Sequence, residues 1–229
     1  MEYLSKVIYQ KPRLIERSFI TSKYNDVLEA NDKFYRENKS LKGWISWSIG
    51  LSLIFIGLVL MLIFNDYNKG TFIVITVTAW LPSIIAIVYG FVAPKKTLVF
   101  NRLKGIITVA PRFQKEFDIP FETGVGIRAL THSDTGGVDQ HLSFSVSKEK
   151  KRKGGIISMV KVDDSWAFMV WYMDRNRPLP PGDAFDAYRE QDYERRKAEG
   201  FPLPLFTSTF DTPEATPEQK AERKRIGRW

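Results

Sequence analysis

Two long stretches without any charged residue constrain this chain more than any other feature of its sequence. Residues 44–64 and 71–93 contain no Asp, Glu, Lys, Arg or His. An α-helix rises about 1.5 Å per residue, so roughly 20 apolar residues are enough to cross the hydrocarbon core of a bilayer. Long buried helices of soluble proteins usually carry polar residues, which these stretches lack. The sequence therefore predicts two transmembrane helices that form one helical hairpin over residues 44–93.

The positions of the basic residues predict how this hairpin is oriented. Lys and Arg accumulate in the cytoplasmic segments next to membrane spans. The loop between the two stretches contains one basic residue, Lys69. The flanking segments contain Lys33, Arg36, Lys39, Lys42, Lys95, Lys96, Arg102 and Lys104. We therefore expect both termini in the cytoplasm and the loop on the opposite side of the membrane.

Small residues recur along both predicted spans at the spacing that allows two helices to approach closely. The predicted helix–helix packing residues are Ser46, Gly50, Gly57, Ala79, Ser83, Ala86 and Gly90. Pro82 removes a backbone donor within the second span and is expected to kink it. Neither span contains an ionisable residue, so a membrane anchor is favoured over a pore or a transporter. A pure anchor and an anchor that also binds a partner both stay open.

The rest of the sequence predicts a membrane α+β protein with three further parts. Residues 1–43 are expected to form a cytoplasmic N-terminal arm with a helix over residues 22–37. Residues 94–177 are expected to form a cytoplasmic strand-rich domain closed by a helix. Residues 178–229 are expected to form a charged helical tail, whose first helix lies on a surface with one thin apolar stripe.

Alternating apolar runs and turn residues define the strand-rich domain. The predicted strands are 97–100, 106–109, 116–120, 124–129, 141–146 and 156–162. The closing helix is expected to begin at Asp164 or Ser165 and to end near Arg175. Its apolar residues one turn apart predict a core face of Trp166, Met169, Val170 and Met173. Short antiparallel strands closed by one helix resemble the architecture of pleckstrin-homology-like domains.

Two helices are predicted in the tail. The first covers residues 183–199 and ends at Gly200, since glycine commonly ends helices. The second begins with Thr216 as its N-cap and Pro217 at its first position, where the missing N–H of proline costs nothing.

No catalytic, cofactor-binding or metal site is predicted. His132 and His141, together with Asp134 and Asp139, flank a Gly-Gly loop, and they are interpreted as a polar connection because metal ligands usually follow helix or strand spacing. The chain has no cysteine, which excludes a disulfide, a thiolate ligand and a cysteine nucleophile. Phosphate-binding loops and nucleophile motifs are also missing from the sequence, so enzymatic activity is not expected.

A basic run is the candidate contact with anionic lipids. It consists of Lys148, Lys150, Lys151, Arg152 and Lys153. Next to a membrane such a run is attracted to acidic headgroups. The alternative is a solvated hairpin tip. Nucleic-acid binding is not expected, because the aromatic residues do not interleave with the basic ones.

Three segments of the tail carry a resemblance to a known family. They are 180–189 (PPGDAFDAYR), 195–202 (RRKAEGFP) and 212–219 (TPEATPEQ). With the order of hairpin, strand-rich domain and tail, nearly the whole chain resembles a family of uncharacterised proteobacterial two-pass membrane proteins encoded beside type VI secretion effectors. The resemblance implies a multi-pass protein of the bacterial inner membrane. It assigns no functional residue.

The same resemblance implies an immunity protein that binds and neutralises a cognate effector. Because the loop over residues 65–70 is short, the effector would be one that acts at the membrane or is met on the cytoplasmic side. The alternatives are a membrane-tethered adaptor or chaperone for effector loading, and a lipid-sensing membrane module. The expected partners are the cognate effector and membrane lipids, and self-association into a homo-oligomer stays open.

Overall fold

The computed structural model divides the chain into two compact units. It describes residues 8–10, 14–15, 27–39, 43–63, 69–92, 96–111, 115–132, 138–146, 154–158, 162–209, 211 and 214–229. One unit is Lys39–Lys95, which we call the hairpin unit. The other combines Met1–Asn38 with Lys96–Trp229, and we call it the sheet unit.

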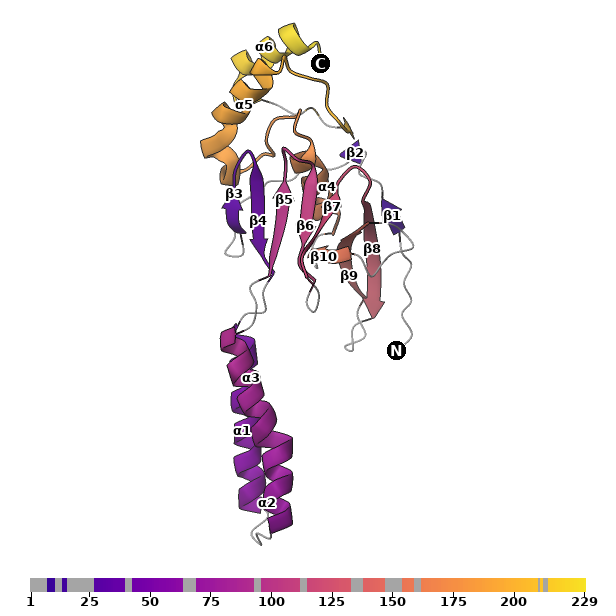
Figure 1. Ribbon diagram of the computed structural model, residues 1–229. Helices are drawn as coiled ribbons and strands as arrows, with labels where there is room; N and C mark the ends of the chain where they lie inside the picture. The colour runs from indigo at the N-terminus through magenta and orange to yellow at the C-terminus, as the bar shows by residue number, and fades with distance from the viewer. Residues whose placement is uncertain are drawn as a thin grey trace. The chain divides into compact units, whose positions relative to one another are not determined.

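A five-stranded antiparallel sheet forms one part of the sheet unit (Figure 1). Its strands, in spatial order, are β3 (Val27–Ala30), β4 (Phe34–Asn38), β5 (Thr97–Asn101), β6 (Ile106–Val109) and β7 (Phe117–Pro120). The predicted hairpin of residues 97–100 and 106–109 is confirmed by the pairing of β5 with β6. Strands β4 and β5 are direct neighbours, although the whole hairpin unit lies between them in the sequence.

A second antiparallel sheet contains four strands. Their spatial order is β1 (Ile8–Gln10), β8 (Val125–His132), β9 (Val138–Ser145) and β10 (Gly154–Ser158). Two short strands, β2 (Leu14–Ile15) and β11 (Thr207–Ser208), pair in parallel. The four strands predicted after residue 115 therefore all exist, with boundaries shifted by at most four residues.

The helix predicted over residues 22–37 is wrong in the described part of that range. Residues 27–30 and 34–38 form β3 and β4, joined by a tight turn. The Asn31 side-chain oxygen accepts hydrogen bonds from the backbone N–H groups of Lys33 and Phe34, which fixes this turn. Pairing with β5 then buries Tyr35, so tertiary contacts outweigh the helical spacing of the apolar residues.

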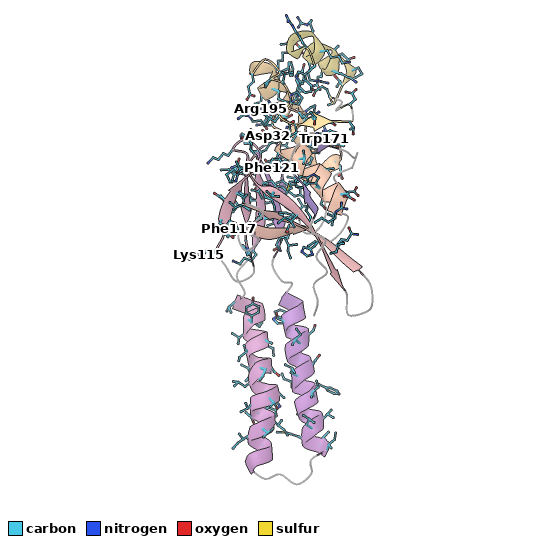
Figure 2. All side chains as sticks on the ribbon, turned by 90° about the vertical axis from the view of Figure 1, so that its right-hand side faces the viewer. Asp32, Lys115, Phe117, Phe121, Trp171 and Arg195 are labelled. Carbon is cyan, nitrogen blue, oxygen red and sulfur yellow. The ribbon has the colours of Figure 1, made fainter. Side chains whose placement is uncertain are left out.

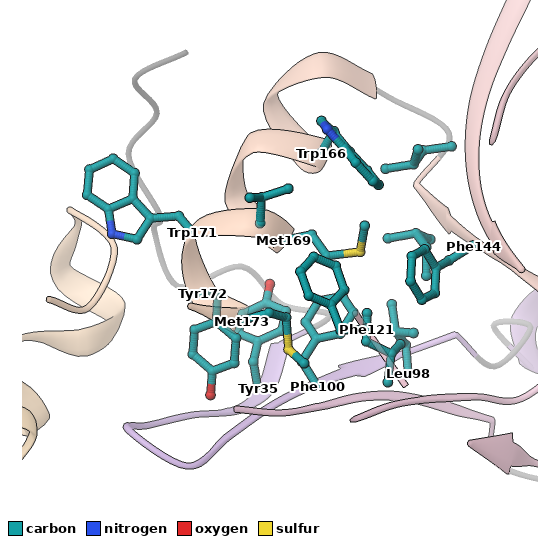
Figure 3. Packing of buried hydrophobic residues seen from close by; sticks show 14 of the residues in the cluster. Tyr35, Leu98, Phe100, Phe121, Phe144, Trp166, Met169, Trp171, Tyr172 and Met173 are labelled. Carbon is teal, nitrogen blue, oxygen red and sulfur yellow. The ribbon is translucent and has the colours of Figure 1, made fainter. Parts of the chain in front are cut away.

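Helix α4 (Val162–Met173) supplies the largest share of the core (Figure 3). It begins two to three residues before the predicted start at Asp164 or Ser165. Its predicted core face is confirmed, because Trp166, Met169, Val170 and Met173 are each at most 7% exposed. The ring of Phe168 on the same helix packs 4.8 Å from that of Tyr35 on β4. The helix thus joins residues from both ends of the sequence into one core.

The tail contains three helical segments, and the charged helix predicted on a surface buries charged residues as well as its apolar stripe. The three segments are the 3₁₀ helix η2 (Asp183–Tyr188), α5 (Arg189–Ala198) and α6 (Pro217–Gly227). Phe185 and two charged residues, Asp192 and Arg196, are buried. The predicted start of α6 is confirmed: the Thr216 hydroxyl accepts a hydrogen bond from the Gln219 N–H at 3.2 Å. Glycine also ends α5 as expected, because Gly200 has a φ of +76°.

The hairpin unit consists of two long apolar helices, as predicted. The first is α1 (Gly43–Ile63). The second is continuous over α2 (Lys69–Ile75), a π-helical turn η1 (Thr76–Trp80) and α3 (Leu81–Val92). The first and last residues of both helices differ by at most two positions from the ends of the uncharged stretches 44–64 and 71–93.

Candidate functional site: an apolar helix hairpin and a buried ion-pair network

The two helices of the hairpin unit present apolar side chains almost everywhere. The segments Ser46–Ile63 and Phe72–Val92 are long and apolar enough to cross a membrane, and only 11% and 17% of their residues are buried. A core helix of a soluble protein would bury most of its residues. The most exposed apolar side chains are Leu62, Phe91, Phe55, Val92, Ile63 and Leu51. In water this surface would be strongly unfavourable, and a lipid environment removes that cost.

Glycine allows α1 to approach the second helix closely. A Cβ atom on Gly50 would lie 2.6 Å from the Ile87 side chain and 3.0 Å from the Ser83 backbone oxygen. A Cβ atom on Gly57 would lie 2.6 Å from the indole nitrogen of Trp80. No side chain fits at these distances without a shift of its neighbours, so both glycines lie at the helix–helix contact.

The other predicted packing residues lie at different depths. Ser46, Ala79 and Ser83 are buried, with exposed fractions of 9%, 3% and 0%. Ala86 and Gly90 are half-buried. Ser46, Ala79 and Ser83 therefore lie within the helix–helix contact, and Ala86 and Gly90 lie at its margin.

A π-helical turn stands where the kink at Pro82 was expected. The Leu81 N–H bonds to the Thr76 oxygen, five residues back. Proline has no N–H and would clash with the oxygen four residues before it, so a wider turn ahead of it relieves the clash. The Thr78 hydroxyl donates to the Val74 oxygen at 2.7 Å, and the Ser83 hydroxyl donates to the Ala79 oxygen. These hydroxyls are thus satisfied within the helix, as a lipid environment requires.

The sheet unit contains a buried ion-pair network that the sequence reasoning missed. It consists of Arg102, Asp192, Arg196, Glu214 and Arg223, and each side chain is at most 2% exposed. Arg102 follows β5, Asp192 and Arg196 lie on α5, and Arg223 lies on α6. The network therefore joins the five-stranded sheet to both helices of the tail.

Asp192 lies at the centre of this network. Its carboxylate is 3.4 Å from a guanidinium nitrogen of Arg102 and accepts a bond from Arg196 at 2.9 Å. Arg195 adds a third contact at 2.8 Å, and Figure 2 labels this residue on α5. Burial disfavours the charged carboxylate, but the three arginines outweigh burial and lower the pKa of Asp192 below its ordinary value. The carboxylate is therefore ionised at neutral pH.

Arg196 extends the network to the last helix. It donates two parallel hydrogen bonds to Glu214, at 2.8 and 2.7 Å. Arg223 approaches the same carboxylate at 3.0 Å, and its guanidinium lies 4.0 Å from the centre of the Trp229 ring. Paired, hydrogen-bonded charges of this kind fix one arrangement of the elements that carry them. The network therefore has the geometry of a structural connection and not of an acid–base pair.

The remaining sequence candidates gain no support as sites. His132 and His141 lie on β8 and β9, opposite Val138 and Ala129. Asp134 and the basic run from Lys148 to Lys153 lie outside the described residues, and so does the side chain of Asp139. Within the described ranges no group of three or more His, Cys, Asp or Glu could hold a metal ion.

Comparison with known proteins gives no relative to which the site can be matched. No protein-family model, curated protein or solved structure matches the chain. A function must therefore be inferred from the two features described above, the apolar hairpin and the sheet unit that flanks it.

Proposed function

We propose that this chain is a two-pass protein of the bacterial inner membrane and acts there as an immunity protein against a type VI secretion effector. The exposed apolar surface of the hairpin unit is the observation that supports the proposed membrane location. More than four fifths of the residues in both apolar segments are not buried by the protein. Lipid is the solvent that such a surface requires.

The sheet topology supports a double crossing. Strand β4 leads into the hairpin and β5 follows it, and these strands pair through five residue positions from Phe34 with Asn101 to Asn38 with Thr97. A single crossing would put the two strands on opposite sides of the membrane and break this pairing. The chain must then return to the side from which it entered, so both flanking segments share one compartment.

The basic residues support a cytoplasmic location for both flanking segments. Eight basic residues flank the hairpin closely in the sequence, from Lys33 to Lys42 and from Lys95 to Lys104. Residues 64–68, which separate α1 from α2, contain no basic residue, and α2 begins at Lys69. By the preference of basic segments for the inner side of the membrane, the sheet unit is cytoplasmic. Its antiparallel strands, covered by α4, support the proposed relation to pleckstrin-homology-like domains.

The immunity role is supported by the family resemblance and by the geometry of the protein. Residues 64–68 are all that separate α1 from α2, which is too little to grip an enzyme outside the membrane. The surfaces available to an effector are the exposed apolar faces of the hairpin and the sheet unit. A membrane-acting effector would be neutralised at the apolar faces of the hairpin. An effector that reaches the cytoplasm would be neutralised at the sheet unit.

Co-expression with the effector encoded beside the gene tests this proposal. Cells that produce the effector should survive only when this chain is present, and the two proteins should co-purify from detergent. Survival should be lost when the hairpin is deleted and β4 is joined to β5 by a short loop, if the effector acts in the membrane. Cells that lack the gene but stay healthy, and only fail to intoxicate their neighbours, would instead identify an adaptor for effector loading.

A further inference from the structure

The five-stranded sheet packs only one of its two faces against the core. The residues on that face are buried among the side chains of α4, and they are Tyr35, Leu98, Phe100, Ile107, Val109 and Ile119. Successive side chains of a strand point to opposite faces, so the residues between them point the other way. Figure 1 shows α4 behind the sheet and no helix of the described residues in front of it. We call this second face the outer face.

Two rows of side chains cross the outer face, because paired residues of neighbouring strands lie on the same face. The first row runs from β4 to β7 through Arg36, Val99, Thr108 and Asp118. The second row runs from β4 to β7 through Phe34, Asn101, Ile106 and Pro120. The apolar residues of the two central strands, Val99 and Ile106, are only half-buried. The outer face therefore has an apolar centre that no described helix covers.

The first row has a positive charge at its β4 end and a negative charge at its β7 end. The Arg36 side chain is 45% exposed, and its guanidinium lies 3.1 Å from Glu29 and 5.0 Å from the centre of the Phe34 ring. Asp118 is exposed and accepts a hydrogen bond from the Thr108 hydroxyl at 2.6 Å. Three strand spacings put β4 and β7 about 14 Å apart, so Arg36 and Asp118 of one chain are too distant to pair.

A second copy of the chain can bring these opposite charges together. When a two-fold axis runs between β5 and β6 and parallel to them, β4 of each copy faces β7 of the other. Arg36 then faces Asp118 of the other copy, Phe34 faces Pro120, and each pair occurs twice. An axis perpendicular to the strands through the first row would set Arg36 against Arg36 and Asp118 against Asp118. Like charges oppose that arrangement, so the charges select the axis parallel to the strands.

We propose that the outer face binds a second copy of this chain, with Arg36 of each copy paired to Asp118 of the other. Sheets that pack face to face keep their strand directions within about 30° and lie about 10 Å apart, which this two-fold axis allows. Four overlapping strands make a small contact, so we expect a reversible dimer and not an obligate one. The inference concerns the sheet unit alone and goes beyond the proposed immunity role.

The test measures energy transfer between full-length copies in phosphatidylcholine vesicles. The chain has no cysteine, so Lys224→Cys provides a single labelling site at an exposed residue of α6. Copies labelled with a donor or an acceptor dye should show more transfer than randomly distributed copies, and the excess should decline as lipid is added. In Arg36→Glu, and separately in Asp118→Arg, we expect association to weaken by about tenfold, because both charge pairs of the dimer become repulsive.

A mixture of the two variants separates this contact from a folding defect. When donor-labelled Arg36→Glu meets acceptor-labelled Asp118→Arg, position 36 of each copy again faces an opposite charge at position 118 of the other. Transfer should therefore return to the wild-type level, which misfolded variants could not achieve. The control Glu194→Arg reverses an exposed charge on α5 and should associate like the wild type.

Four outcomes would overturn the proposal. They are no excess transfer in the wild type, undiminished transfer in either single variant, no recovery in the mixture, and an equal loss in the control. None of them bears on the proposed membrane span or on survival in the co-expression experiment, so the dimer and the immunity role fail or stand separately.

Discussion

Asp192 is the residue on which the arrangement of the tail depends most. It connects an arginine that follows β5 with two arginines of its own helix, and it is 1% exposed. A buried charge that loses its partner cannot be compensated by water. Three arginines around one carboxylate make this position more sensitive than any single surface ion pair of the tail.

We expect Asp192→Asn to destabilise the sheet unit by about 3–5 kcal/mol, because it leaves buried arginines without their counter-charge. Chemical unfolding in detergent, followed by tryptophan fluorescence, measures this loss. Glu194→Gln on the same helix is the matched control, since that side chain is exposed. Equal stability of the two variants would show that the network contributes nothing.

The lowered pKa of Asp192 also predicts a pH dependence. A carboxyl group whose pKa is lower in the folded than in the unfolded state stabilises the fold above its unfolded pKa. This stability is lost as the pH falls through the folded pKa, so the loss occurs below about pH 4. Unfolding midpoints measured from about pH 7 to about pH 3 should therefore fall less steeply for Asp192→Asn than for the wild type. Parallel curves would contradict this assignment.

Individual residues were predictable where local spacing decides their environment. The buried face of α4 follows from apolar residues one turn apart, and the cap at Thr216 follows from a short local pattern. Asp192 and Arg196 follow the same i, i+4 spacing, but a helix rich in charges is usually solvated. Their burial depends on Arg102, far away in the sequence, and no local pattern contains that partner.

At the scale of elements, the helix predicted over residues 22–37 was wrong because a turn and strand pairing determine the structure of that segment. The segment around Asn31 has apolar residues at helical spacing, yet its Asn side chain closes a turn between two strands. Strand β4 then acquires a neighbour, β5, that lies beyond the hairpin in the sequence. A pairing over such a distance could not be derived from either segment alone.

A close contact of the two apolar helices makes Gly57 a sensitive position of the hairpin. In Gly57→Val the new Cβ would lie 2.6 Å and 2.8 Å from atoms of the Trp80 indole ring. Overpacking of this kind typically costs about 1–3 kcal/mol. We expect a lower thermal unfolding midpoint in detergent for this variant. Leu62→Val, at a side chain that is 81% exposed, should leave the midpoint unchanged.

For the whole molecule, the decisive property is that sequence segments on both sides of the hairpin build one compact unit. The chain contains no cysteine, so a single introduced cysteine reports its own location. In intact cells, a membrane-impermeant maleimide should label Asn68→Cys in the loop but not Lys224→Cys on α6. Lys224→Cys should react only after the cells are permeabilised. Labelling of Lys224→Cys in intact cells would overturn the proposed topology.

Because the hairpin lies in the sequence between two paired strands, the order of synthesis affects how the sheet forms. A ribosome makes β3 and β4 before the hairpin and β5 only after it. Until then, β4 has an unpaired edge that could associate with other chains. If the hairpin crosses a membrane as proposed, the sheet can close only after both apolar helices have been inserted and the chain has come back, so completion of the sheet unit would report that insertion succeeded. A hairpin inserted halfway would leave an open edge, which is the feature that quality-control proteases and chaperones encounter in a misfolded chain.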